Sequence, residues 1–194
     1  MTAAARFLDD LSDGNWPRAA QSRPRAITAS LHGSLAFTGI GHGSDRAVIL
    51  GLAGEHPQSV DPDAMDAIIA GVRETGTVSP KAHRPYRFRP AVDLVLDRTN
   101  PLPGHPNGMQ FCAFDDDGQL LLRRIYYSIG GGFVVTDEEL DAVRTASPAD
   151  QDVPWPFADA AEMLDMAARS GLSIAAMKRA NEEARLPRAR LDRQ

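Results

Sequence analysis

A strong turn signal between two strand-like runs constrains the fold more than any other feature of the chain. The runs MQFCAF and QLLLRRIYYSIG are separated by Asp115-Asp116-Asp117-Gly118. A short turn of aspartate and glycine between two apolar runs is typical of a β-hairpin, in which the two strands lie antiparallel. We therefore expect an antiparallel pair of strands in the second half of the chain.

The N-terminal half alternates between helical and strand-like patterns. Residues 3–11 carry apolar side chains at helical spacing and run into the stop signal SDG. Residues 26–38 are rich in small and β-branched side chains, which predicts a strand with a bulge at Gly33. A further helix is predicted over residues 61–74, because DPD suits a helix start and the apolar residues that follow share one face.

The remaining segments carry weaker signals. Residues 76–106 hold six prolines and two short alternations, which indicates short edge strands and loops. GGFVVTDEEL predicts a glycine loop, a strand and a helix that starts at Thr136 or Asp137. Two amphipathic helices follow, over residues 158–170 and 173–185. Strands first and a helical pair last favour an α+β domain, with a mixed, largely antiparallel sheet packed by helices.

Composition excludes several classes of protein. With 43% hydrophobic and 24% charged residues in 194, the chain is expected to form one globular domain. A formal charge of -5 disfavours nucleic acid as a partner. The single cysteine, Cys112, cannot close an internal disulfide and is expected to be a buried, inert thiol. No apolar run is long enough to cross a membrane, so we expect a cytoplasmic protein without a membrane partner.

The loop GIGHGSD is the most specific candidate site. It contains three glycines spaced two residues apart: Gly39, Gly41 and Gly43. Glycine can adopt positive φ angles and lets a ligand approach the backbone closely. Ser44 or Asp45 is expected to cap the next helix, whose free N–H groups attract an anion, and His42 lies in the middle of the loop. A dinucleotide fingerprint is excluded by its spacing, whereas a purely structural turn is an equal alternative.

A second candidate is the run of three glycines in YYSIGGGF. Gly130, Gly131 and Gly132 are costly in conformational entropy between two apolar runs. Either a close ligand or a crossing chain could require them, and a plain loop is the alternative. Asn107 and Gly108 in HPNGMQF are first of all a turn signal before a strand.

Four motifs in this order resemble one family: LHGSLAFTGIGHGSDRAVILGLAGEHPQSVDPD, HPNGMQF, YYSIGGGFV and VPWPFADAAEML. The family is the iron–sulfur-dependent L-serine dehydratase, or L-serine ammonia-lyase, of bacteria. The resemblance covers its N-terminal or β domain and nearly the whole chain. It implies a fold similar to the allosteric substrate-binding domain of some phosphoglycerate dehydrogenases.

The resemblance also implies how the chain is divided. Residues 1–185 correspond to the β domain without the family's extreme N-terminal segment of serines and histidine. Residues 186–194 form a basic tail, the start of the link to an α domain that lies on the same or a separate polypeptide. One departure from the family is His32, where an aromatic Tyr is expected before GSL.

The family converts L-serine to pyruvate and ammonia with a 4Fe-4S cluster. The resemblance implies that cysteines of the α domain ligate this cluster and that this chain does not. The cluster's open iron draws off the β-hydroxyl, a base removes the α-proton, and hydrogen-bond donors hold the substrate. This chain alone is therefore expected to be inactive, and to act with the α domain on L-serine.

The resemblance implies that His42 is the base or the substrate-orienting group. Histidine titrates near neutral pH, and His42 is expected at a helix N-terminus. The residues expected to bind substrate are Gly41, Gly43, Ser44, Asp45, Ser34, Asn107, Ser128, Gly130, Gly131 and Gly132. Packing against the α domain is the alternative for each of them, and it is favoured for Ser34 and Ser128.

Two other functions remain open at this point. One is a non-catalytic regulatory module that binds serine or an anion, since the phosphoglycerate dehydrogenase domain has no dehydratase activity and fold similarity cannot decide function. The other is an inactive remnant, whose exposed apolar surface would favour self-association. A homodimer is also among the expected assemblies.

Overall fold

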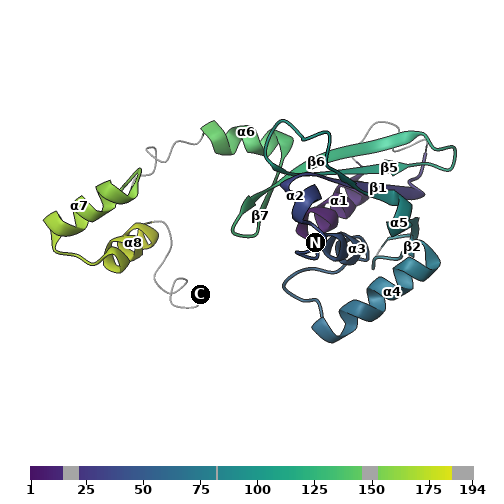
Figure 1. Cartoon of the computed structure of the whole chain (residues 1–194), viewed down its shortest axis with the longest axis horizontal. Coiled ribbons are helices and arrows are strands. Elements are labelled where there is room, and N and C mark those ends of the chain that lie inside the picture. Colours follow the sequence, from purple (N-terminus) through teal and green to yellow (C-terminus); the bar gives the residue numbers. More distant parts are fainter. Residues whose placement is uncertain (15–21, 82, 146–152, 185–194) are drawn as a thin grey trace. The chain divides into compact units, whose positions relative to one another are not determined.

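The computed structural model describes residues 1–14, 22–81, 83–145 and 153–184 (Figure 1). The chain divides into two compact units, Met1–Leu140 and Asp141–Gln194. The first holds the sheet and the candidate site residues, and the second holds a pair of helices. The predicted basic tail, residues 186–194, lies outside the described residues.

A seven-stranded mixed sheet forms the framework of the first unit. Its long antiparallel part runs β1 (Ala26–Gly33), β5 (Asn107–Phe114), β6 (Leu120–Gly130) and β7 (Phe133–Thr136). The other edge of β1 pairs in parallel with two short strands, β3 (Tyr86–Arg87) and β4 (Leu94–Asp97). β2 (Thr77–Val78) pairs antiparallel with β3. This confirms the expected α+β class with a mixed, largely antiparallel sheet.

Eight α-helices accompany the strands within the described residues. They are α1 (Thr2–Asp13), α2 (Ser34–Thr38), α3 (Ser44–Leu52), α4 (Met65–Thr75), α5 (Pro90–Asp93), α6 (Asp137–Thr145), α7 (Ala160–Ser170) and α8 (Ile174–Glu183). The predicted hairpin is confirmed as β5 and β6, and the two predicted C-terminal helices are confirmed as α7 and α8 with Gly171 between them. The predicted helix over residues 61–74 is a 3-10 turn followed by α4, capped by the Asp61 side chain.

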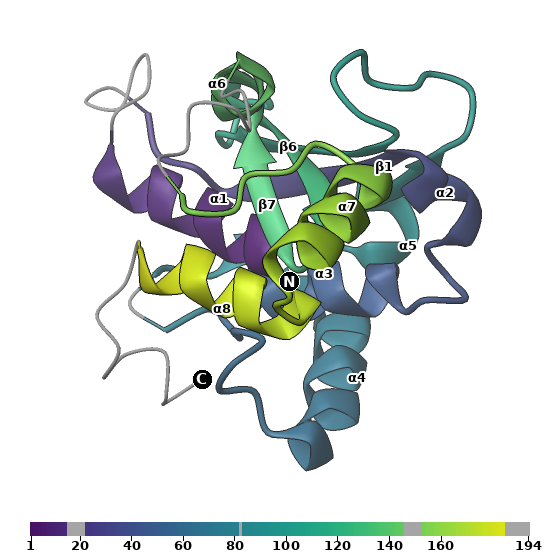
Figure 2. The same ribbon diagram turned by 90° about the vertical axis from the view of Figure 1, so that its left-hand side faces the viewer.

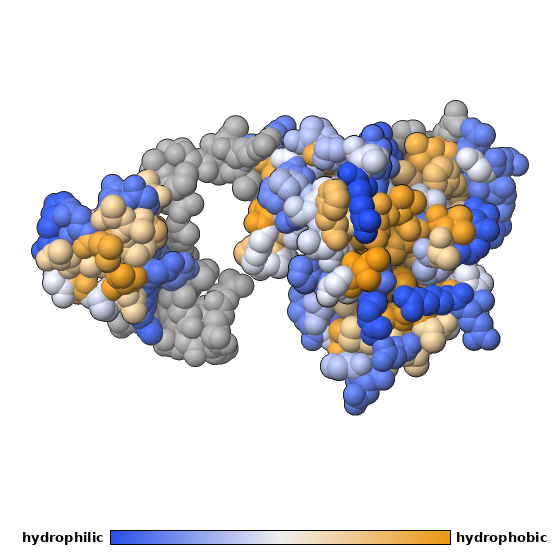
Figure 3. Space-filling model, in the orientation of Figure 1, coloured by the Kyte–Doolittle hydropathy of each residue, from blue (hydrophilic) through white to orange (hydrophobic). Residues whose placement is uncertain are grey.

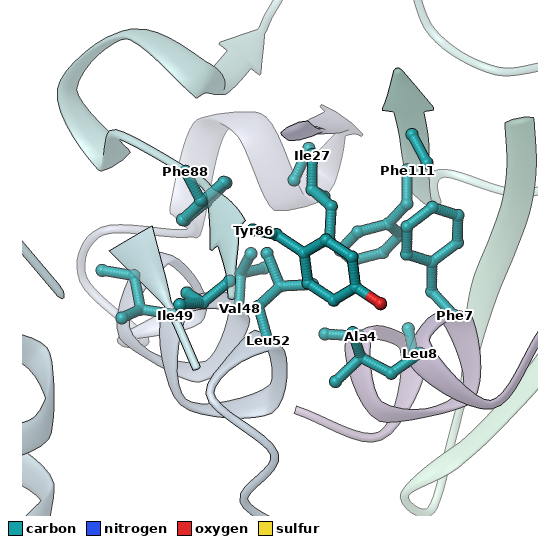
Figure 4. Packing of buried hydrophobic residues seen from close by; sticks show 14 of the residues in the cluster. Ala4, Phe7, Leu8, Ile27, Val48, Ile49, Leu52, Tyr86, Phe88 and Phe111 are labelled. Atoms are coloured by element: carbon teal, nitrogen blue, oxygen red, sulfur yellow. The ribbon is translucent and has the colours of Figure 1, made fainter. Parts of the chain in front are cut away.

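The core lies between one face of the sheet and helices α1 and α3 (Figures 1 and 2). Phe7 of α1 stacks on Phe111 of β5 with 5.5 Å between ring centroids, and both rings are buried (Figure 4). α3 lies close to α1, because a Cβ added at Gly51 would stand 2.7 Å from the Cβ of Ala4. A larger residue at position 51 would therefore push the two helices apart.

A buried tyrosine joins the sheet to α1. The ring of Tyr126 on β6 is fully buried, and its hydroxyl donates a 2.7 Å hydrogen bond to the Asp10 carboxylate. Arg124 lies 3.3 Å from the same carboxylate, and the Arg6 guanidinium lies over the Tyr126 ring. Burial, followed by the hydrogen bond to Asp10, raises the pKa of Tyr126 well above its usual value. The hydroxyl is thus held in its neutral, donating form.

Replacing Tyr126 with phenylalanine is expected to lower the free energy of unfolding by about 1–2 kcal/mol, because the Asp10 carboxylate loses a hydrogen bond to a buried donor. Urea denaturation measures this change. The double variant Tyr126→Phe with Asp10→Asn should lose less than the sum of the two single losses. Strict additivity would show that the two groups do not interact.

The end of β1 departs from the prediction. Residues 34–38 form the short helix α2, so the predicted strand stops at Gly33 instead of continuing through a bulge. Gly33 has φ 56° and ψ -131°, a conformation open to glycine, and the Ser34 N–H donates to the carbonyl of Pro106 at 2.8 Å. The glycine therefore turns the chain from strand into helix.

The end of β7 is tied to α1 by one glutamate. The Thr136 hydroxyl accepts from the Glu139 N–H at 3.1 Å, and the Glu139 carboxylate accepts from the Thr136 N–H at 2.8 Å. This capping box confirms the predicted helix start. Arg6 of α1 donates to the same carboxylate and to the carbonyl of Val134, both at 2.8 Å.

Candidate functional site

The turn between α2 and α3 presents the GIGHGSD motif. Backbone hydrogen bonds close it: the N–H of His42 donates to Thr38 at 3.1 Å, and that of Ser44 donates to Gly39 at 2.7 Å. Gly43, with φ 65°, is the residue that precedes the first turn of α3, and Ser44 is already helical. The predicted cap by Ser44 or Asp45 is therefore wrong, because the left-handed Gly43 takes that position. No side chain caps α3 within the described structure.

The His42 side chain is exposed on this turn. Among the residues that the structure describes, the ring has no hydrogen bond or ion pair with another side chain. It is thus held by a closed backbone turn yet available to a molecule from outside. An imidazole in this setting can accept a proton or donate a hydrogen bond.

The three glycines of the turn have three different surroundings. Gly43 needs its positive φ, and a Cβ at Gly39 would stand 2.3 Å from the carbonyl oxygen of Leu35. Gly41 has neither constraint: its φ is outside the left-handed region, and an added Cβ would be 3.6 Å from the carbonyl oxygen of Thr38. Only Gly43 thus fits the expectation of positive φ. The fold of this chain gives no reason for glycine at position 41.

Ser34, Asn107 and Ser128 gather at one end of the sheet. Gly33 pairs with Asn107 across β1 and β5, which brings Ser34 beside the start of β5. The Asn107 side-chain amide donates to the carbonyl of Ser128 at 3.3 Å. The Asn107 backbone N–H donates to the ring of His105 at 3.1 Å. Within the described residues, Asn107 thus holds strand ends together, and a role in substrate binding remains a prediction.

The glycine run forms the tip of the β6–β7 hairpin. Gly130, Gly131 and Gly132 have φ angles of 96°, 60° and 80°, so the backbone conformation itself requires glycine. Added Cβ atoms at Gly130 and Gly132 would meet nothing within 4 Å. Glycine is therefore required at these positions by the conformation of the turn, and not by another described segment of this chain that passes close by. Phe133 at this tip is 70% exposed.

A groove of about 390 Å³ opens beside the GIGHGSD turn. Ile49, Leu94 and Leu96 contribute apolar walls. Asp45, Arg73 and Arg89 contribute its charged groups. Asp45 is the one predicted site residue that lines the groove, and His42 does not line it.

Sequence reasoning missed Arg73 and Arg89. Arg73 lies in the last turn of α4, and Arg89 precedes α5. Neither position belongs to a local motif, and the fold alone brings Arg73 against Asp45 and places Arg89 in the same groove. An arginine four residues before Asp93 was the single local sign of a positioned guanidinium.

The described residues do not form a metal centre. No group of three or more histidine, cysteine, aspartate or glutamate side chains could hold a metal ion in the described part of the chain. Cys112 is buried, as expected, and its burial raises the pKa of the thiol. A four-iron cluster needs about four ligands, so these residues do not fit one. No helix of the described residues is long and apolar enough to span a membrane.

Comparison with known proteins gives consistent matches. A family model described as the serine dehydratase beta chain matches residues 1–139. The L-serine dehydratase of Streptomyces coelicolor is 38% identical over 159 residues, which are 82% of this chain and 35% of that protein. The L-serine dehydratase TdcG of Escherichia coli is 34% identical over 192 residues, 99% of this chain and 40% of that protein. The chain spans about two fifths or less of the length of these relatives.

Proposed function

The chain belongs to the serine dehydratase beta chain family, and from this premise we propose that it works with an iron–sulfur-bearing α domain to convert L-serine to pyruvate and ammonia. The match over residues 1–139 is the observation that carries the proposal. It ends one residue before the boundary of the first compact unit, so the matched part is a structural unit as well. The chain alone is proposed to be inactive, because its described residues offer no cluster site.

The division of the chain is part of the proposal. We assign residues 1–185 to the β domain and residues 186–194 to the start of the link to the α domain. The 4Fe-4S cluster is proposed to be held by cysteines of that α domain. When bound there, it would supply a Lewis acid for the departing hydroxyl.

His42 is proposed to accept the α-proton of L-serine or to orient the substrate. Its exposed ring on a closed backbone turn supports this role. The uncapped first turn of α3 supports a place for the carboxylate, because its N–H groups and the helix dipole favour an anion. Ser44 would stand beside this carboxylate.

The remaining predicted residues are proposed to line the wall that meets the substrate or the α domain. Ser34 and Asn107 lie at one sheet end, and Ser128 accepts from the Asn107 amide. The glycines at the β6–β7 tip, Gly130 to Gly132, complete this set. Open space around Gly130 and Gly132 supports contact with a second molecule.

Co-expression tests the proposed function directly. The chain is produced anaerobically with its candidate α partner, and pyruvate formation from L-serine is followed together with cluster absorbance. Turnover in the mixture, with none from either part alone, is the expected result. Cluster-loaded partner that turns over L-serine equally well without this chain would contradict the proposal.

Replacing Gly41 with alanine separates a substrate contact from a folding role. The free energy of unfolding should change by no more than about 0.5 kcal/mol, because the added Cβ has room. In the reconstituted enzyme, kcat/KM should fall about tenfold, since a methyl group would stand where the substrate approaches. Urea denaturation and steady-state kinetics measure the two effects.

Gly43→Ala is the matched control for this variant. Its φ of 65° predicts a loss of about 1–2 kcal/mol in the free energy of unfolding. If Gly41→Ala loses as much stability as Gly43→Ala, the distinction drawn between the two positions is wrong. Unchanged kcat/KM in a stable Gly41→Ala enzyme would show that the substrate does not approach the backbone closely at position 41.

A regulatory module that binds serine or an anion is the second candidate function. The uncapped start of α3 favours it, because that feature is complete within this chain. Isothermal titration of the chain with L-serine and with inorganic phosphate tests it. Binding in the absence of the α partner is expected of a regulatory module and is not required of the catalytic one.

A further inference from the structure

The groove between α3, α4, α5 and β4 has features of a small-molecule site. Its volume of about 390 Å³ falls in the range of ligand pockets, roughly 300–1,000 Å³. Its apolar walls include Ile49, which is 1% exposed, and the partly buried Leu94 and Leu96 of the edge strand β4. In the space-filling view, apolar surface interrupted by hydrophilic residues covers the face that carries α2, α3 and α5 (Figure 3).

One arginine of the groove is held rigidly in place. The carboxylate of Asp93, whose side chain is 8% exposed, accepts from the Arg89 backbone N–H at 2.7 Å and from its Nε at 3.2 Å. The aliphatic part of the Arg89 side chain lies against Gly76, where an added Cβ would stand 2.9 Å from its Cγ. Such fixed positioning reduces the entropy that a guanidinium loses when it binds a ligand.

The other arginine forms a long ion pair with a carboxylate of the groove. The Arg73 guanidinium lies 3.6 Å from the Asp45 carboxylate. This distance exceeds that of a good hydrogen bond, so donors of Arg73 remain available. Arg73, Arg89 and Asp45 line the groove, and Asp93, which lies outside the lining, neutralises Arg89. The charges of these four groups sum to zero. A neutral ligand that carries one charge of each sign therefore matches them better than a simple anion.

We propose that this groove binds a free α-amino acid with an aliphatic side chain. The carboxylate of the ligand lies on Arg73 and Arg89, its ammonium group faces Asp45, and its side chain packs on Leu94 and Leu96. An aliphatic side chain suits this site because most of its lining is apolar. The site adds a regulatory or sensing function to the chain and does not depend on the proposed dehydratase reaction.

Titration of the full chain with L-leucine tests the proposal by calorimetry and by the shift in Tm. We expect L-leucine to bind and L-serine to bind at least about tenfold more weakly, because serine lacks the apolar group. The oxo acid with the leucine skeleton should also bind at least about tenfold more weakly, since it lacks the ammonium group. No binding of L-leucine at millimolar concentration, or equal binding of L-serine or of the oxo acid, would overturn the proposal.

Variants locate the binding in the groove. Arg73→Ala should weaken the binding of L-leucine about tenfold or more. Ala91→Phe fills the groove from the exposed start of α5 and should abolish binding while every charge remains. Arg46 is the matched control, because it also links α3 to α4, through an ion pair with Asp66, but does not line the groove.

The controls decide the outcome. Arg46→Ala should leave the affinity for L-leucine unchanged. Equal losses in Arg46→Ala and Arg73→Ala, or full affinity in a folded Ala91→Phe chain, would place the ligand elsewhere and refute the assignment. Because binding is measured on this chain alone, failure here leaves the co-expression test of dehydratase activity unaffected.

Discussion

Replacing Gly33 with alanine is expected to lower the free energy of unfolding by about 3 kcal/mol or more. Two causes add. The backbone at φ 56° and ψ -131° is strained for a residue with a side chain, and the new Cβ would stand 2.2 Å from the carbonyl oxygen of Pro106. This carbonyl accepts from the Ser34 N–H, so relief of the clash would also break that hydrogen bond.

Urea denaturation of the Gly33→Ala chain measures this loss, with Gly71→Ala as the control. Gly71 lies inside α4, and an added Cβ there meets nothing within 4 Å. Alanine is the better helix former, so this control should gain about 0.5–1 kcal/mol. The same substitution is thus expected to change the free energy of unfolding in opposite directions at the two glycines. A Gly33→Ala chain as stable as the parent would show that the turn from β1 into α2 does not have the described conformation.

Replacing His42 with alanine is expected to lower kcat of the reconstituted enzyme about 10²- to 10⁴-fold, the range typical of a lost general acid or base. The Tm of the chain should remain unchanged, because the His42 side chain is exposed. The backbone N–H of residue 42, which closes the turn on Thr38, is retained in the variant. Kinetics with L-serine and thermal unfolding measure the two quantities.

Two further variants define what His42 does. His42→Gln keeps a hydrogen-bonding side chain but cannot take up the α-proton, so it should recover KM and not kcat if His42 is the base. His56→Ala removes another exposed imidazole from the same unit and should have wild-type kinetics. Near-normal kcat in His42→Ala would exclude a catalytic role and favour the regulatory module.

Local signals in the sequence predicted most elements of the fold. The turn at residues 115–118 fixes the β5–β6 hairpin, where the Asp115 side chain accepts from the N–H groups of Asp117 and Gln119. Thr136 and Glu139 form a capping box, a signal that spans four residues. Such features depend on neighbours in sequence, and so the sequence reveals them.

The missed features depend on contacts that are distant in sequence. Helix α2 has five residues, too few to show a helical period, and the strand-like composition of residues 34–38 concealed it. The conformation of Gly33 that starts this helix is coupled to Pro106, more than seventy residues away. In the same way, the groove joins Asp45, Arg73 and Arg89 from three elements. The glycine-rich turn was found because its residues are consecutive.

The Glu139 carboxylate accepts hydrogen bonds from two parts of the first unit. It is shared between the start of α6 and Arg6 of α1, and hydrogen bonding by Arg6, followed by the Thr136 N–H, lowers its pKa. The start of α6 is therefore anchored to α1 within the first unit. Through Arg6, the start of α6 is thus connected to the helix whose Phe7 stacks on Phe111 in the core.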